Sequence, residues 1–182
     1  MSRLTIPATI EDAPEAARPL LEAVRSQLGS APNLFRLAAL SPAALEGHLA
    51  MTGALAKGAL PATTRHRIAL AVAQVNGCDY CLSAHTYINR TLVKLDDAEI
   101  AANRAGASTD PKADAAVRFA AKVAQARGHV GEDDVRAVKL AGYTDAQVIE
   151  IIQHVALNTW TNYLNSAVQT DIDFPVVRRD AA

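Results

Sequence analysis

The hydrophobic residues of this chain are gathered into stretches that end at glycine, proline or polar capping residues. No stretch shows the strict alternation of apolar and polar side chains that predicts a half-buried strand. The boundaries instead match helix signals, with proline, Ser, Thr or Asp at the starts and glycine after the ends. The pattern therefore predicts an all-α protein, with helices over residues 12–28, 33–40, 41–57, 61–75, 78–95, 96–105, 110–127, 132–141 and 144–168.

Two of these helices carry clear start signals. Ser41 followed by Pro42 forms an N-cap and first-turn pair. Thr144 and Gln147 have the spacing of a capping box. The segment 171–182 is polar and is expected to be extended, and no Gly/Ser-rich linker divides the chain.

The helical segments 62–75 and 146–157 are so apolar that each should be buried on nearly every side. A single domain formed by residues 1–182 has limited room for two such helices. We therefore expect a homo-oligomer, in which some apolar faces meet another subunit. The alternative is a monomer whose own core is filled by these helices.

Composition narrows the function further. Half of the residues are hydrophobic but only 4% are aromatic, which favours closely packed helices. The net charge of −1 gives no electrostatic reason to expect binding to nucleic acid or to an anionic membrane. No apolar run approaches the ~20 residues that span a bilayer, and the segment from Met1 to Asp12 lacks the apolar core of a secretory signal. We therefore expect a cytoplasmic protein, in a compartment that keeps thiols reduced.

The two cysteines of the chain, Cys78 and Cys81, are close in sequence, and His85 follows one helical turn later. A disulfide between them would close a short loop and remove little unfolded-chain entropy, so it would be a poor structural staple. On a helix, positions i, i+3 and i+7 share one face, which brings the imidazole near the second sulfur. The spacing is typical of a redox-active CxxC dithiol or of part of a metal site.

Spacing alone does not decide which sulfur attacks a substrate. Cys78 is nearer the helix N-terminus, where unpaired N–H groups and the positive dipole end stabilise a thiolate. Only Cys81 has an imidazole four residues later. A general base removes the thiol proton during the reaction, whereas the dipole only biases the resting pKa. We therefore favour Cys81 as the attacking thiol and Cys78 as the resolving thiol.

The stretch 65–85, with its C-x-x-C-x-x-x-H core, resembles the alkyl hydroperoxidase D (AhpD-like) family of the carboxymuconolactone decarboxylase-like superfamily. The stretches 158–165 and 170–175 resemble the C-terminal part of its peroxidase-related members, so the similarity covers about residues 30–176. The resemblance implies an all-helical fold, homo-oligomers and thiol-dependent reduction of hydroperoxides. It also implies that the cysteine nearer the histidine attacks the peroxide, in agreement with the choice of Cys81.

One position departs from the family pattern. The family's proton relay includes a glutamate twelve residues before the first cysteine, and this chain has His66 there. A carboxylate would stabilise His85 as an imidazolium, whereas His66 passes a proton without supplying negative charge. We expect His66 to relay protons to His85 and Cys81 to be less activated, unless another carboxylate takes the place of the glutamate. A solvated surface position is the alternative for His66.

Other interpretations of the cysteine pair stay open. The pair could be buried and inert, or it could join both histidines in a zinc site formed by Cys78, Cys81, His85 and His66. A redox sensor or disulfide oxidoreductase would use the same dithiol without turning over peroxide. A non-redox decarboxylase of the superfamily would not depend on it.

The remaining histidines and the late asparagines give weaker signals. We expect His154, which lies on an apolar helix face, to be buried in the core. We expect His48 and His129 to lie at the surface. We expect packing, interface and helix-end polar contacts from Trp160, Asn162, Tyr163 and Asn165, with a role near the active site as the alternative.

Together these features predict a thiol peroxidase whose catalytic residues are Cys81, Cys78, His85 and His66. The sequence contains no metal, flavin or haem motif, so we expect no bound cofactor. The electrons would come from an external dithiol or disulfide reductase, and the substrate would be a hydroperoxide.

Overall fold

The computed structural model describes residues 2–179, and within that range every regular element is a helix. The all-α prediction is therefore confirmed. The helices are α1 (Arg18–Leu28), α2 (Asn33–Ala38), α3 (Pro42–Ala56), α4 (Ala62–Val75), α5 (Asp79–Ile88), α6 (Asp97–Arg104), α7 (Pro111–Gln125), α8 (Glu132–Leu140) and α9 (Asp145–Val168). A 3₁₀ turn (Glu15–Ala17) precedes α1 and a π turn (Asn89–Val93) follows α5.

The predicted start signals act as expected. The hydroxyl of Ser41 accepts a hydrogen bond from the Ala44 amide at 3.3 Å and caps α3. The Gln147 amide donates to the Thr144 hydroxyl at 3.2 Å, while the Thr144 amide donates to the Gln147 side chain at 3.0 Å. These reciprocal bonds satisfy donors that a helix start leaves unpaired.

Two predicted helices differ from the structure. The first begins at Arg18 and not at residue 12, because the Asp12 carboxylate accepts hydrogen bonds from the amide and hydroxyl of Thr9 and closes a preceding turn. The helix predicted over 78–95 changes to a π turn at Asn89. The fully buried Asn89 side chain donates to the backbone oxygen of His66 at 3.3 Å and ties this turn to α4.

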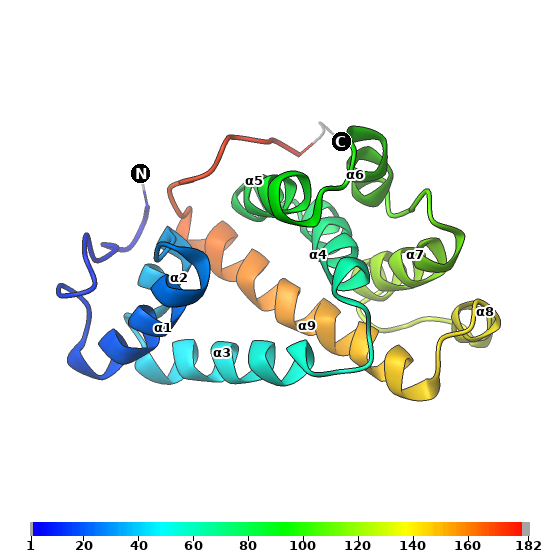
Figure 1. Ribbon diagram of the computed structural model, residues 1–182, viewed down its shortest axis with the longest axis horizontal. Helices are drawn as coiled ribbons and strands as arrows, with labels where there is room; N and C mark the ends of the chain where they lie inside the picture. Colours follow the sequence, from blue (N-terminus) through cyan, green and yellow to red (C-terminus); the bar gives the residue numbers. More distant parts are fainter. Residues whose placement is uncertain (1, 180–182) are drawn as a thin grey trace.

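Helices α4 and α9 form the centre of the molecule. In Figure 1, α9 runs diagonally through the view, with α3 below it and with α7 and α8 at the far end from α1 and α2. Helix α4 packs against α5, α6, α7 and α9. Its Ile68 and Val72 are fully buried in an apolar cluster with Val117 of α7 and Ile151 of α9. The predicted burial of this helix is therefore confirmed over its middle turns.

Helix α9, in contrast, leaves apolar side chains in solvent. Ile149, Ile152, Trp160 and Tyr163 share one side of the helix, and Ile149 is 67% and Tyr163 60% exposed. The homo-oligomer stays a prediction, and this stripe is the face that we expect it to cover. None of the helices within residues 2–179 is both long enough and apolar enough to cross a membrane.

We expect the double variant Ile149→Glu, Tyr163→Glu to sediment as a monomer, because two charges on that face would have to be buried without partners. Sedimentation velocity at micromolar concentration measures this. Leu92→Glu, at a 69% exposed position on the π turn, is the matched control and should keep the wild-type sedimentation coefficient. A wild-type protein that already sediments as a monomer would contradict the prediction.

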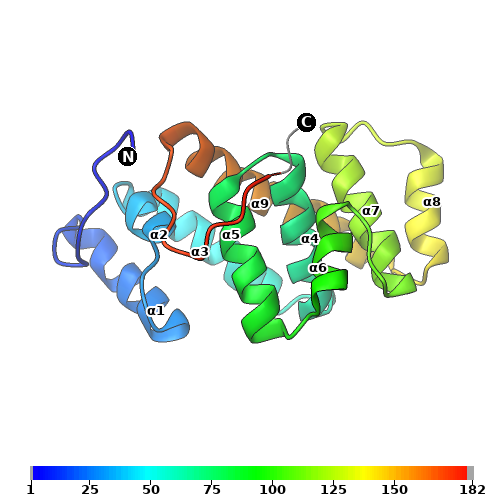
Figure 2. The same ribbon diagram turned by 90° about the horizontal axis from the view of Figure 1, so that it is seen from above.

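The C-terminal segment after α9 crosses over α5 (Figures 1 and 2). The Val177 amide donates to the Ser83 hydroxyl at 2.9 Å, and the Phe174 ring packs edge-on against the Tyr80 ring. Residues 171–179 are not helical, as predicted, while residues 180–182 of the predicted tail lie outside the described range. The segment therefore forms part of the wall around the cysteines.

Candidate functional site

The dithiol lies at the junction of α4 and α5. Gly77, with φ of +65°, lets the chain turn after α4, a conformation that favours glycine. Cys78 is the N-cap of α5, and its sulfur accepts a hydrogen bond from the Cys81 amide at 3.3 Å. The two Sγ atoms lie 2.7 Å apart, and both cysteines are free and buried. The two sulfurs are therefore close enough to form a disulfide through a small movement.

The two thiols have different protonation preferences. The hydrogen bond with Cys81 lowers the pKa of Cys78, although burial opposes this. Burial raises the pKa of Cys81, and the neighbouring Cys78 sulfur raises it further. The resting negative charge is therefore more stable on Cys78, at the helix N-terminus, as the dipole argument predicts. A reaction that used the Cys81 thiolate would therefore need a base to remove the thiol proton.

His85 is available as such a base. Burial and the nearby His66 lower the pKa of His85 to about 4, so its ring is neutral at physiological pH. Its Nδ1 atom is buried and has no hydrogen-bond partner within the described range. No hydrogen bond joins the ring to a sulfur among residues 2–179, so a proton transfer requires the ring or the thiol to reorient.

His66 is half-buried on α4 and lowers the pKa of His85 through its proximity. Its own pKa is lowered by burial and by Arg65. The structure therefore places His66 near His85. His66 carries no negative charge, so it cannot stabilise His85 in its protonated imidazolium form. Among residues 2–179, no carboxylate is hydrogen bonded or ion paired to either ring.

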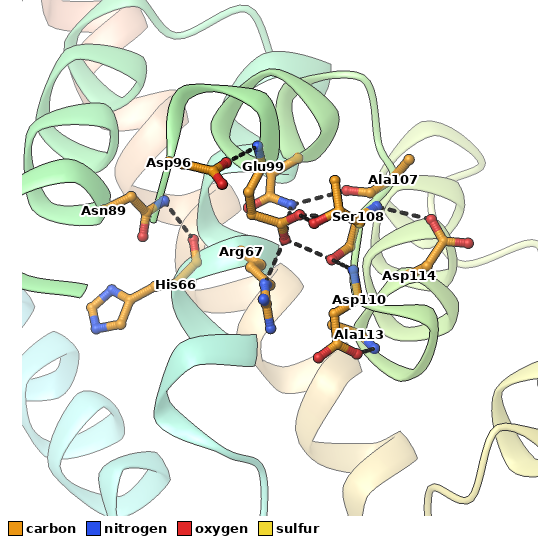
Figure 3. Close-up of polar contacts among 12 residues, drawn as sticks. His66, Arg67, Asn89, Asp96, Glu99, Ala107, Ser108, Asp110, Ala113 and Asp114 are labelled. Atoms are coloured by element: carbon orange, nitrogen blue, oxygen red, sulfur yellow. Dashed lines mark hydrogen bonds and ion pairs between the residues drawn. The ribbon is translucent and has the colours of Figure 1, made fainter. Parts of the chain in front are cut away.

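The buried carboxylate of Glu99 forms hydrogen bonds away from both histidine rings (Figure 3). Glu99 of α6 is 3% exposed and accepts hydrogen bonds from the Arg67 guanidinium at 2.6 Å and the Ser108 hydroxyl at 2.6 Å. It also accepts from the Thr109 amide at 2.6 Å. Figure 3 shows the His66 ring pointing away from this cluster. Glu99 therefore fixes α4 to α6 and does not replace the missing relay glutamate.

Three asparagines of α9 are buried beside Cys81 or the apolar pocket next to it, and two of them, Asn162 and Asn165, were predicted to make packing contacts. Asn158, Asn162 and Asn165 are buried at positions i, i+4 and i+7. The Asn165 side-chain amide donates to Cys81 Sγ at 3.4 Å, and both Asn165 and Asn162 oppose the rise in the pKa of Cys81. The packing interpretation of Asn165 was therefore incomplete. The recurrence of asparagine along one face of an apolar helix is the signal that reveals it.

An apolar pocket of about 240 Å³ lies on the Cys81 side of the dithiol. Cys81 and His85 share its wall with Phe35 and Phe174. His48 also lines it, is half-buried, and stacks on Trp160 with ring centroids 4.9 Å apart. The surface position predicted for His48 was therefore wrong, since the aromatic contact draws the ring inward.

A polar cavity of about 620 Å³ lies on the Cys78 side. Its wall includes Arg3, Arg178 and Arg179, and the carboxylates of Asp79 and Asp171. A third cavity, of about 820 Å³, is lined by residues of α4, α6, α7 and α8 and by neither a cysteine nor a histidine. Of these three cavities, only the first two are lined by a cysteine.

The zinc alternative requires two cysteines and two histidines that converge. Among residues 2–179, no group of three or more His, Cys, Asp or Glu side chains is arranged to hold a metal ion. The arrangement does not supply the donor set of a tetrahedral site.

Two solved structures of similar shape are described as peroxidase-related. One, described as an alkylhydroperoxidase AhpD core and an uncharacterized peroxidase-related protein from Ralstonia eutropha JMP134, is 28% identical with a TM-score of 0.82. That comparison covers 94% of this chain and 92% of that chain. An uncharacterized peroxidase-related protein from Silicibacter sp. TM1040 is 25% identical with a TM-score of 0.80, over 93% of this chain and 91% of that one.

A third similar structure shares the fold alone. It is the debrominase Bmp8 in complex with 2,3,4-tribromopyrrole, which is 22% identical with a TM-score of 0.77, over 95% of this chain and 94% of that chain. No curated protein matches the chain. The model of the carboxymuconolactone decarboxylase family matches residues 42–126, which include the dithiol. The family-model match and the two peroxidase-related structures together support an AhpD-like member of the carboxymuconolactone decarboxylase superfamily, and with it a peroxidase-related function at the level of the family.

Proposed function

We propose that this protein is a thiol peroxidase that reduces organic hydroperoxides with Cys81 and Cys78. The observation that carries the proposal is the pair of buried free sulfurs 2.7 Å apart, one of which shares an apolar pocket with a neutral histidine. The pocket suits the organic part of the substrate, because its walls are mainly aliphatic and aromatic. The reductant is an external dithiol or disulfide reductase.

In the first step, neutral His85 accepts the proton of the Cys81 thiol, and the thiolate attacks the terminal oxygen of the hydroperoxide. The O–O bond breaks, and the departing alkoxide takes the proton from His85 and leaves as an alcohol. Cys81 becomes a sulfenic acid. His66 exchanges protons with His85 between turnovers.

In the second step, the Cys78 sulfur attacks the sulfenic acid of Cys81. A disulfide forms, and the hydroxyl group leaves with a proton as water. The lowered pKa of Cys78 supports this resolving role, because a larger thiolate fraction is ready to attack. Two electrons from the external reductant then restore both thiols.

Stopped-flow mixing of the fully reduced protein with cumene hydroperoxide tests the proposal. We expect one peroxide and two thiols to be consumed per chain, faster than by free cysteine. A rate no greater than that of free cysteine would reject peroxidase function. Slow reaction with peroxide but fast reaction with a disulfide would instead favour a disulfide oxidoreductase.

The missing relay glutamate leads to a gain-of-function prediction. We expect His66→Glu to raise the rate of peroxide consumption about tenfold, because a carboxylate near His85 stabilises the imidazolium that forms during thiol deprotonation. The pKa of His85 should rise from about 4, so the acid limb of the pH–rate profile should move to higher pH. Stopped-flow rates between about pH 4 and 8 measure both effects.

His66→Gln is the matched control, since it has a similar volume and no negative charge. It removes the lowering of the His85 pKa by His66 but adds no negative charge, so it should move the acid limb to higher pH by less than His66→Glu does. If the Glu and Gln variants gave the same profile, a carboxylate at position 66 would have no electrostatic influence on His85, which would contradict the prediction.

A further inference from the structure

We propose that the polar cavity beside Cys78 is the entry for the reductant and that it selects a slender thiol carrying negative charge. This inference rests on the proposed function in one respect, namely that the oxidised state is the Cys78–Cys81 disulfide. It names the class of reductant, which the proposed function leaves open.

The two sulfurs open onto different surfaces. Cys81 lines the apolar pocket and Cys78 lines the polar cavity, and the two linings share only Tyr80. An apolar hydroperoxide and a polar reductant therefore reach the dithiol from separate sides. A reductant arriving through the polar cavity meets Cys78 first.

The charge of the polar cavity favours an anion. Its three arginines are exposed, and only Arg178 is ion paired within the described range, with Asp79 at 2.9 Å. The guanidinium groups of Arg3 and Arg179 donate to the backbone oxygens of Ala167 and Gly77, which carry no net charge. These two groups remain positive centres that attract an anion at the cavity rim. Two carboxylates oppose this charge: Asp79, which acts on Arg179 as well as on Arg178, and Asp171, which accepts from the Ser2 amide. The three arginines outnumber them at the rim.

The depth of Cys78 restricts the shape of the reductant. Cys78 is only 1% exposed and lies beneath a cavity of about 620 Å³. The flat surface of a folded protein does not reach a sulfur at that depth, whereas a small thiol or a thiol on a thin arm does. Access of this kind decides which sulfur of a disulfide is attacked.

The reduction is an ordinary thiol–disulfide exchange. A thiolate of the reductant attacks Cys78 Sγ, a mixed disulfide forms, and the bond to Cys81 breaks. Cys81 leaves as a thiolate that accepts the hydrogen bond of Asn165 and is then protonated. A second thiol of the reductant displaces Cys78, and the reductant departs oxidised, having supplied two electrons.

Two dithiols with the same carbon skeleton, one ending in a sulfonate and the other in a neutral hydroxyl group, test the inference. The protein is first oxidised to the disulfide with diamide, so that no peroxide is needed. Its reduction is then timed with 2,3-dimercaptopropane-1-sulfonate and with 2,3-dimercaptopropan-1-ol, each rate being divided by that for 2-hydroxyethyl disulfide. We expect the sulfonate to be about tenfold faster at low salt. The advantage should largely vanish at about 1 M salt, where screening is strong.

The double variant Arg3→Gln, Arg179→Gln should bring the ratio of the two rates close to one. Arg118→Gln, which removes an exposed arginine of α7 paired with Asp114, is the matched control and should keep the ratio. Equal rates in the wild type, or an unchanged ratio in the double variant, would overturn the inference. So would reduction by a thioredoxin-type protein alone.

Because the disulfide is made without peroxide, the inference and the proposed function fail separately. Charge-selective reduction in a protein that does not consume hydroperoxide would support the inference and reject the peroxidase. Peroxide turnover without charge-selective reduction would support the peroxidase function and reject the inference about the reductant.

Discussion

Replacing Cys81 by serine will slow the consumption of hydroperoxide by at least about a hundredfold, because the hydroxyl group is a far weaker nucleophile. Cys78→Ser should keep the first reaction with peroxide and lose the second, since no sulfur remains to form the disulfide. Single-turnover stopped-flow with one equivalent of cumene hydroperoxide measures the first reaction. The two variants control for each other, because each removes one buried sulfur from the same cluster.

The opposite result has an equally clear meaning. If Cys78→Ser loses the first reaction and Cys81→Ser keeps it, the low pKa of Cys78 outweighs the base beside Cys81. Attack would then come from the helix N-terminus, and the two roles would be exchanged.

Replacing Glu99 by glutamine will lower the free energy of unfolding by about 3–5 kcal/mol, because it leaves the Arg67 charge buried without its partner. The Arg67 side chain is only 13% exposed. The side-chain NH₂ group of the new glutamine would also point at the Ser108 hydroxyl or the Thr109 amide, which are themselves hydrogen-bond donors to Glu99. Urea unfolding followed by circular dichroism measures the change. Glu132→Gln, at an exposed first-turn position of α8, should stay within about 0.5 kcal/mol of wild type.

The same carboxylate makes stability depend on pH. Burial by itself raises the pKa of Glu99. Hydrogen bonds from Ser108, Thr109 and Asn103 outweigh burial and lower this pKa from 4.5 to about 2. A carboxylate with a lowered pKa stabilises the fold above the pKa of the unfolded chain and loses that contribution as the pH falls toward 2. Wild type should therefore lose stability between pH 4.5 and 2 by more than Glu99→Gln does. Parallel pH profiles would contradict this role.

The helix boundaries were predictable because their causes are local. The Ser41 cap, the Thr144–Gln147 capping box and the Gly77 turn each depend on residues within four positions of one another. Asp12 was misleading because its side chain bonds to a residue before it, and the sequence does not tell in which direction a carboxylate turns.

The dithiol was predictable for the same reason, but its surroundings were not. Asn165 meets Cys81 across 84 positions, and the C-terminal Val177 meets Ser83 across 94. Such contacts follow from how α9 and the last segment pack on α5, which no local pattern contains. The engagement of Glu99 with Arg67, next in sequence to His66, is likewise a product of packing between α4 and α6.

The assignment of the attacking sulfur is tested most directly by intact-mass analysis of Cys78→Ser after one equivalent of cumene hydroperoxide. We predict a lasting gain of one oxygen atom on Cys81, trapped by dimedone, and no such gain in Cys81→Ser. A sulfenic acid that forms on Cys78 in Cys81→Ser, and none on Cys81 in Cys78→Ser, would contradict the account.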